Sequence, residues 1–449
     1  MKKIRNLSEG SFLKLLFAFV AAAFLIAAVC MPDRANMFTG LWKILSGTCK
    51  ISTNYFALGG LSATFLNMGL VCLISLLLFV IFRGTPNNVS TLAVLLTVGF
   101  GSWGIHVLNI WPTIFGVMIY GLIKKEKMGG LVNAMLFSTG IAPIISELLL
   151  RYPGTEYIGF NWLGLGLALV VGFVIGFFLP AGLAHSPKVH KGFDLYSAAL
   201  PIGMTAFLLN AILFKTMGLD VNALSTGAAM DVTHRMTVNI FCGAVFGLCV
   251  VFAFILGCRP KDYWKLLKDP ALVTNFSSTY GNATFLMNMG VFGLFILGYY
   301  NLIGAPFTGM TFGIIFCMVA TCNSGSHPGN VWPIMLGYVL ASTVCGWVAQ
   351  YIPGADFTNN INAQAICIGL CYANGLSPIA DKYGWRYGFI AAILHYLLVT
   401  SVPALHGGFC LYNGGFTAAL ICLIFVPELE RFFRTKEERK AAKLQKANN

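Results

Sequence analysis

The stretch SHPGNVWPIMLG at Ser326–Gly337 decides the fold, because the chain contains it twice. The earlier copy, IHVLNIWPTIFG, occupies Ile105–Gly116, 221 residues upstream. At this single offset the matched pairs are His106 with His327, Asn109 with Asn330, Trp111 with Trp332, Pro112 with Pro333, Asn54 with Asn275, Gly60 with Gly281, and Asn67-Met68-Gly69 with Asn288-Met289-Gly290. A gapless register over roughly sixty residues indicates an internal duplication.

The repeated dodecamer predicts the start of a helix. Asn109 and Asn330 are suitable N-cap residues, since their side-chain oxygen can accept from a free backbone N–H. A proline follows three residues later in each copy, in the first turn, where its missing N–H costs nothing. Breaks rich in small polar residues lie directly upstream, at 101–104 and 322–325. Each unit is therefore predicted to run helix, break, helix; in a soluble protein an ordinary capped loop would be preferred.

The composition indicates an integral membrane protein. Of the 449 residues 57% are hydrophobic and only 10% are charged, and several segments carry eighteen or more nearly uncharged apolar residues. The net charge of +13 does not indicate a nucleic-acid partner, because the basic residues lie between apolar segments and at the tails. The thirteen cysteines form no CxxC pair, which predicts buried core residues without a metal or cofactor site.

The apolar segments can be placed along the chain. They are predicted at 11–31, 52–82, 87–101, 110–123, 129–149, 159–183, 194–214, 237–257, 276–300, a pair within 303–350, 361–379, 386–403 and 411–427. The first follows Lys2, Lys3 and Arg5 as a signal peptide would, but no small-residue cleavage site follows it. We therefore expect a retained first helix.

The positive charges predict the orientation. With both termini in the cytoplasm, all but six of the 29 Lys and Arg residues fall on the cytoplasmic side; the six are Arg34, Lys43, Lys50, Arg151, Lys215 and Arg235. This asymmetry predicts a multipass protein of the cell inner (plasma) membrane. The charged tail at 428–449 is expected beside anionic lipid.

The duplication extends to the second part of each repeat, where the direction of the copies is inverted. TGIAPI at Thr139–Ile144 matches NGLSPI at Asn374–Ile379, and HKGFDLY at His190–Tyr196 matches HGGFCLY at His406–Tyr412. In each pair the copies approach opposite membrane faces. We therefore predict an all-α polytopic fold of two inverted-topology repeats, each with about seven apolar segments. The predicted domains are 11–231, 237–427 and the tail.

These motifs resemble those of an uncharacterised bacterial family of multipass membrane proteins with two copies of one domain of unknown function. The elements that carry the resemblance are Asn67–Gly69, His327–Pro333 and His406–Gly415, and it covers the chain from about Thr53 to the tail. The resemblance implies a membrane protein and no particular substrate. The architecture is similar to that of inverted-repeat carriers, which is an analogy only.

The candidate site lies at the breaks. The spans 84–123 and 301–355 contain no Lys, Arg, Asp or Glu, although each contains a break and a histidine. We expect re-entrant hairpins whose tips stop inside the protein; two full crossings per hairpin remain the alternative. Tips entering from opposite faces would bring two helix N-termini together near the midplane, where they suit an anion. The predicted substrate-binding residues are His106, Asn109, His327, Asn330, Asn67, Asn288, Ser102 and Ser324.

Other polar residues are less specific. Asn67 and Asn288 suit cavity lining, cation coordination or helix packing equally well. His190 and His406 stand at helix ends near water, where a structural role is expected. Asp194 has Cys410 as its twin, which excludes a symmetric metal site.

The leading functional interpretation is a secondary transporter for a small polar solute, an anion being one option. There is no nucleotide-hydrolysis motif, so an ion gradient or the solute's own gradient is the expected energy source. Buried carboxylates are scarce, which disfavours a proton relay built on Asp or Glu and leaves histidine-linked H⁺ or Na⁺ as the expected coupling ion. A passive channel is the alternative. A membrane-embedded, lipid-modifying enzyme is less favoured, because no paired acids or nucleophile motif are present, and we expect no enzyme activity. The expected partners are the solute, membrane lipids and, as an option, a second copy of the chain.

Overall fold

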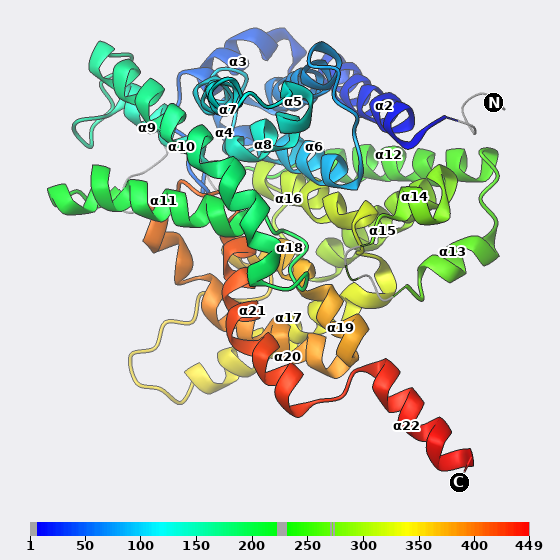
Figure 1. Cartoon of the computed structure of the whole chain (residues 1–449). Coiled ribbons are helices and arrows are strands. Elements are labelled where there is room, and N and C mark those ends of the chain that lie inside the picture. The colour runs from blue at the N-terminus through cyan, green and yellow to red at the C-terminus, as the bar shows by residue number, and fades with distance from the viewer. Residues whose placement is uncertain (1–6, 222–230, 270–271, 273, 449) are drawn as a thin grey trace.

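The computed structural model describes residues 7–221, 231–269, 272 and 274–448. The N-terminal Lys and Arg residues and the stretch 222–230, near the end of the predicted first repeat, lie outside this part of the chain. Within it all regular elements are helices (Figure 1). Seven described helices are long and apolar enough to cross a membrane, and the bent pair Met128–Ile141 and Pro143–Leu150 makes up to eight.

The helices of the two halves correspond one to one. The pairs are α2 (Glu9–Cys30) with α12 (Arg235–Ile255), α4 (Tyr55–Gly59) with α14 (Phe276–Tyr280), α5 (Leu61–Ile81) with α15 (Asn282–Leu302), α6 (Asn88–Phe100) with α16 (Gly309–Val319), α7 (Trp111–Lys124) with α17 (Pro328–Ala349), α8 (Met128–Ser138) with α18 (Gln364–Ala373), α9 (Pro143–Leu150) with α19 (Ser377–Tyr383), α10 (Trp162–Val189) with α20 (Trp385–Val399), and α11 (Ala199–Leu213) with α21 (Asn413–Phe432). Three further helices are α3 (Met37–Leu45), α13 (Pro260–Leu266) and α22 (Lys436–Asn448). The predicted duplication is therefore present in the fold.

The two repeats are inverted with respect to each other. Helix α2 begins beside α14, where Ser277 Oγ donates to Glu9 Oε1 at 2.7 Å. Its counterpart α12 begins shortly after Val232. The Val232 carbonyl accepts at 3.0 Å from Nδ2 of Asn54, the residue that caps α4. Each repeat thus holds the start of the other's first helix. Because Asn54 and Asn275 cap the equivalent helices α4 and α14, the two contacts are mates across a pseudo-twofold axis.

Two faces follow from these contacts. The basic face is the one where α2 begins, and it carries the ion pair between Lys191 and Glu430 and the contact of Arg439 with the Tyr383 carbonyl. The opposite face joins loops far apart in the chain: Tyr157 Oη donates to Ser46 O at 3.1 Å, and Ile51 N donates to Gly408 O at 2.9 Å.

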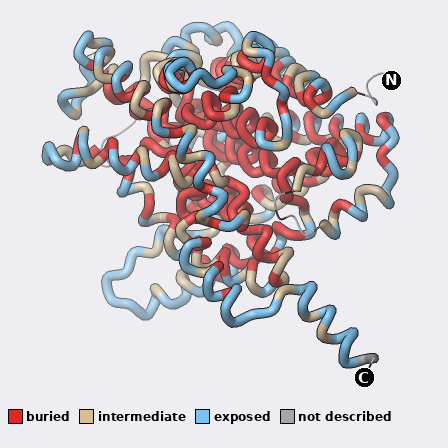
Figure 2. Tube along the Cα trace, viewed as in Figure 1, coloured by how far each residue is buried: buried red, intermediate tan, exposed pale blue. Residues whose placement is uncertain are grey.

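The core lies where the two repeats meet. Helices α6 and α16 are equivalent and cross each other, as do α11 and α21, so the pseudo-twofold axis passes between the members of each pair. A Cβ on Gly99 would lie 2.6 Å from Gly313 O, so only glycine permits this approach of α6 to α16. Buried residues are concentrated in this central region, and the loops and α22 are exposed (Figure 2).

The predicted continuous segments 52–82, 129–149, 276–300 and 361–379 are broken helices, which corrects the sequence-based boundaries. Gly60, with a φ of 88°, separates α4 from α5, and Gly281, with a φ of 85°, separates α14 from α15. Between α8 and α9 the chain bends by 51°, because Pro143 starts a new helix after the 3-10 turn η2 (Thr139–Ile141). The turn η6 (Asn374–Leu376) divides α18 from α19 in the same way.

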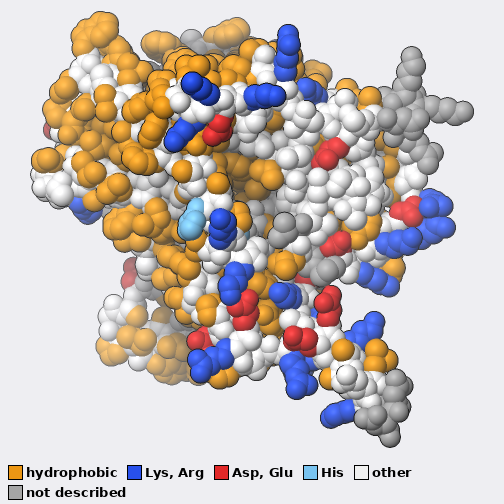
Figure 3. All heavy atoms as spheres, viewed as in Figure 1, with side chains coloured by type: hydrophobic (Ala, Val, Ile, Leu, Met, Phe, Trp, Pro, Cys, Tyr) orange, Lys and Arg blue, Asp and Glu red, His pale blue; other side chains and the backbone are white. Residues whose placement is uncertain are grey.

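Hydrophobic and basic side chains cover different parts of the outer surface. Hydrophobic side chains cover the region over α9, α10 and α11, whereas Lys and Arg gather over α13 and near α22 (Figure 3). Large apolar side chains there, such as Trp162 and Phe178, are more than half exposed. An exposed apolar belt between polar ends is typical of a chain that spans a bilayer.

Candidate functional site between the repeats

The NMG asparagines hold the two breaks in place. Asn67 Nδ2 donates to the carbonyls of Gly101 and Ile105 at 2.7 and 3.0 Å. Asn288 Nδ2 makes the equivalent bonds to Cys322 and Ser326, at 2.8 and 2.9 Å. Both side chains are fully buried. A break in a membrane helix exposes carbonyls that need donors, so the geometry of these two residues supports the packing role.

The histidine and asparagine of each HxxNxWP segment form a local turn. Asn109 Oδ1 accepts from His106 N at 2.9 Å, and Asn330 Oδ1 accepts from His327 N at 3.0 Å. The amide nitrogens donate back to Gly104 O at 3.3 Å and Gly325 O at 2.9 Å. The same pair of bonds closes each break onto the following helix.

The prediction that the asparagines are N-caps is wrong. Helix α7 begins at Trp111 with Ile110 as its N-cap, and α17 begins already at Pro328 with His327 as its N-cap. The Asn side chains reach back to the histidine N–H, which is the role of the third residue in a capping box. Pro333 therefore lies inside α17, not at its first turn.

The two HxxNxWP segments make their side-chain hydrogen bonds within their own repeats. Asn109 Nδ2 and His106 Nε2 lie 3.0 and 3.2 Å from Ser146 Oγ on α9, one residue before the Glu147 carboxylate that pairs with Arg151. Asn330 Nδ2 donates to Asp381 Oδ2 at 2.6 Å on α19, the helix that Arg439 contacts. Helix α9 runs toward the opposite face and α19 toward the basic face. The geometry therefore groups these residues into two structural units with partners toward different faces.

This difference between the repeats predicts unequal effects of one substitution. In Asn330→Asp the new carboxylate would face Asp381 and lose the donor, at a cost of about 2–4 kcal/mol. In Asn109→Asp the new carboxylate also loses the bond to Gly104 O, but it can accept from the Ser146 hydroxyl and faces no second carboxylate, so the cost should be smaller, about 1–3 kcal/mol. Thermal unfolding of the purified variants checks the ranking. Equal losses, or a larger loss for Asn109→Asp, would contradict it.

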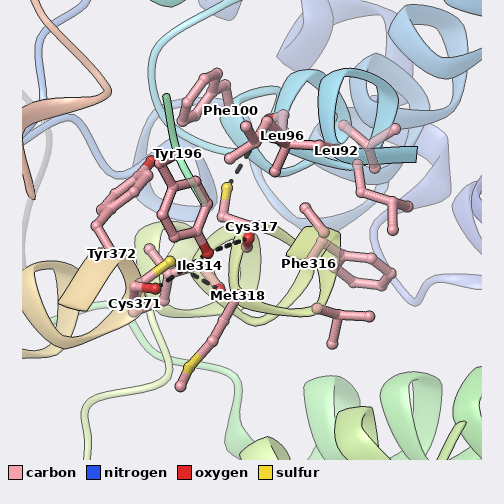
Figure 4. Packing of buried hydrophobic residues seen from close by; sticks show 14 of the residues in the cluster. Leu92, Leu96, Phe100, Tyr196, Ile314, Phe316, Cys317, Met318, Cys371 and Tyr372 are labelled. Carbon is pink, nitrogen blue, oxygen red and sulfur yellow. Dashed lines mark hydrogen bonds between the residues drawn. The ribbon is translucent and has the colours of Figure 1, made fainter. Parts of the chain in front are cut away.

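The HxGFxLY loops lock the repeats together. Leu195 N, in the first repeat, donates to Gly375 O in the break of the second at 3.1 Å. The mate of this bond runs from Leu411 N to Gly140 O at 2.9 Å. The tyrosine that ends the first loop reaches farther: Tyr196 Oη donates to Cys317 O and Cys371 O, at 2.9 and 3.2 Å (Figure 4). Each loop is therefore seated on the broken helix of the other repeat.

We call the paired contacts of Leu195 with Gly375 and of Leu411 with Gly140 the interlock. Two cavities flank the interlock, and they are pseudo-symmetry mates. The larger, of about 550 Å³, opens on the basic face, and the smaller, of about 310 Å³, lies on the opposite face. Equivalent lining residues are Val89 and Met310, Asn133 and Ile368, Leu183 and Val399, Ala184 and Thr400, Pro187 and Pro403, and Ser197 and Asn413. Val89 is 39% exposed and Met310 is 0% exposed, so the opposite-face cavity is the more closed.

The larger cavity carries most of the polar chemistry. His190 Nε2 lies 2.8 Å from Ser197 Oγ, and His190 Nδ1 accepts from Asp194 N at 3.3 Å. Burial lowers the pKa of His190 to about 4, so the ring is neutral at pH 7. With Nδ1 accepting, the proton is on Nε2, which leaves the Ser197 hydroxyl hydrogen free for a solute. Ser324 is the one predicted site residue that lines this cavity.

The remaining predicted residues lie elsewhere. Ser102 is fully buried, with its hydroxyl bonded to Gly99 O at 2.8 Å, where α6 crosses α16. His406, the twin of His190, is also fully buried. The cavity residues Asn133, His190, Asp194 and Ser197 were not predicted as a site. For His190 and Asp194 the signal in the sequence was the repetition of HxGFxLY, in which the two copies differ at Lys191 against Gly407 and at Asp194 against Cys410.

A family model matches the chain twice, over residues 33–215 and 259–431. No curated protein and no solved structure is significantly similar to the chain. The two matches fall on the two repeats of the fold and together cover most of the chain. The protein therefore belongs to the family described as protein of unknown function (DUF1576), in duplicate.

Proposed function

We propose that the protein is a secondary transporter for a small polar solute, which enters the cavity on the basic face. One observation carries this proposal: two cavities lined by equivalent residues lie on opposite faces and differ in volume and exposure. In an inverted repeat, exchange of the two repeat conformations would close one cavity and open its mate. The present conformer is then the one open to the basic face.

The cavity lining supports a neutral polar solute over an anion. Among the described residues that line it are Glu126 and Asp194, and they include no Lys or Arg. Asn133 Oδ1 is buried there without a partner in the described structure, so it is free to accept from a solute. A volume of about 550 Å³ is within the usual range for small-molecule sites. By the positive-charge asymmetry the basic face is proposed to be cytoplasmic, in the inner membrane.

Paired cysteine labelling tests the alternation. Val89→Cys and Met310→Cys, each in a cysteine-free background, report on the two cavities. We expect Val89→Cys to react at least ten-fold faster with a membrane-impermeant maleimide, and from the basic face. Asp356→Cys and Glu437→Cys, on exposed segments, serve as labelling controls for the two faces.

Solute identity follows from a thermal-shift screen of the purified protein against metabolites. A stabilising compound should then show saturable uptake and counterflow in proteoliposomes, and should shift the two labelling rates in opposite directions. If both positions become reactive together, the cavities form a continuous pore and the protein is a channel.

A further inference from the structure

Asp194 is a buried carboxylic acid at the larger cavity. It lies in the loop between α10 and α11, outside the membrane-spanning helices, and is 2% exposed. Its Oδ1 accepts from Tyr196 N at 2.9 Å. Its Oδ2 has no hydrogen-bond partner among the described residues, although the residue lines the larger cavity.

The surroundings of Asp194 disfavour its charged form. The titratable groups that face it are His190 and Tyr196 from its own loop and Cys422 from α21; Gly375 faces it from the broken helix of the other repeat. None of these is a cation at pH 7, since His190 is neutral. An isolated buried carboxylate is costly, so the group takes up a proton instead. Burial raises the pKa of Asp194 to about 7.

Asp194 lies at a contact between the two repeats, so its affinity for a proton depends on how the repeats are arranged. A Cβ on Gly375 would lie 2.8 Å from Asp194 Oδ1, and the next residue, Leu195, bonds to the Gly375 carbonyl. Exchange of the two repeat conformations would give Asp194 the place that its twin Cys410 holds now, which is 0% exposed and lines neither cavity. The carboxyl, which lines the larger cavity in the present conformer, would then be shut off from that cavity and would have a different proton affinity.

We propose that Asp194 is the proton-binding site that couples the proton gradient to the alternation of the two cavities. This inference rests on the proposed transport function and names its coupling ion. It differs from the sequence-based expectation, which left histidine-linked protons or sodium because buried carboxylates are scarce. His190 positions the loop and stays neutral. The equivalent residue in the second repeat is Cys410, so only the first repeat carries a carboxyl group at this position.

The direction of the pH effect follows from linkage. In the exchanged conformer Asp194 would take the place of Cys410, which is fully buried and lines neither cavity, so the carboxyl would bind its proton more tightly there than in the present conformer, where its pKa is about 7. Acid therefore favours the conformer open to the opposite face. As the pH rises above about 7, Asp194 ionises beside the larger cavity and the conformer open to the basic face gains population.

The test measures the ratio of labelling rates at Val89→Cys and Met310→Cys between pH 5.5 and 8.5, with the maleimide rates corrected by the exposed control cysteines. We expect the ratio of the Val89→Cys rate to the Met310→Cys rate to rise at least ten-fold as the pH rises, with the increase beginning near pH 7. Asp194→Asn keeps the acceptor for Tyr196 N and should abolish the dependence. Asp194→Ser, close in size to the cysteine at the equivalent position, should do the same. His190→Gln should keep it.

The outcomes separate the two proposals. Reciprocal labelling that stays pH-dependent in Asp194→Asn, or that is flat in the parent protein, overturns the proton site and leaves the transporter standing. Labelling that rises or falls at both positions together overturns the alternation itself. Loss of the pH dependence in His190→Gln with retention in Asp194→Asn would assign the proton to the histidine and overturn the inference.

Discussion

Adding one methyl group at Gly140 should sharply reduce the yield of folded protein. A Cβ there would lie 2.0 Å from Tyr412 Cε2, and Tyr412 is a fully buried side chain of the interlock. The ring cannot move aside without breaking the bond from Leu411 N to Gly140 O. Overpacking in a rigid core costs about 1–3 kcal/mol, and loss of the interlock adds to that. We expect Gly140→Ala to yield less than a tenth of the monodisperse protein.

The matched control is another helical glycine. Gly298→Ala, on α15, meets no atom within 4 Å, so it should be neutral or stabilising by about 0.5–1 kcal/mol. Gly375→Ala, the mate of Gly140, should be milder, because its Cβ would meet Tyr196 Cδ2 at 2.7 Å. Size-exclusion profiles after detergent extraction give the three yields. Equal yields for Gly140→Ala and Gly298→Ala would show that the interlock is not rigid.

Removing the amide of Asn67 should cause the second large loss. In Asn67→Ala the carbonyls of Gly101 and Ile105 lose their common donor inside the core. Each buried unsatisfied carbonyl costs about 1–3 kcal/mol, so a loss of about 2–5 kcal/mol is expected. Asn288→Ala should behave alike, since Asn288 makes the same two bonds in its repeat.

Ser75→Ala provides the control on the same helix. The Ser75 hydroxyl is buried and bonds only to Val71 O of its own helix, at 2.8 Å. Its removal should therefore cost less than about 1 kcal/mol. Thermal unfolding of the three variants in one detergent measures the differences. If Asn67→Ala unfolds within a degree of Ser75→Ala, water satisfies the freed carbonyls and the asparagine is not a structural support.

Several features of the fold could be predicted from local patterns. The 221-residue register revealed the duplication, and the alternation of basic segments revealed the inversion. The breaks at 101–104 and 322–325 were predicted because small residues and a following proline mark them locally. The breaks at Gly60 and Gly281 were missed, because one or two glycines within a long apolar segment are compatible with a continuous helix.

The candidate site was predicted less well. The HxxNxWP repetition marked His106 and His327 for solute binding, whereas the fold uses these segments within each repeat to close its break. Repetition shows that a position matters in both copies and does not separate packing from binding. At Asp194 the informative signal was the opposite one, a position of the repeated motif at which the two copies differ, Asp194 against Cys410.

By itself the sequence determined the class of the protein: a duplicated, inverted, all-helical membrane chain with interrupted helices. Hydropathy, charge and glycine or proline spacing act locally, so they are readable along the chain. Only the tertiary structure decided that each HxGFxLY loop sits on the other repeat, that the cavities are unequal, and that Asp194 lies buried beside the larger one. These features depend on contacts between residues about 180 or more positions apart, such as Leu195 with Gly375, for which no local pattern codes.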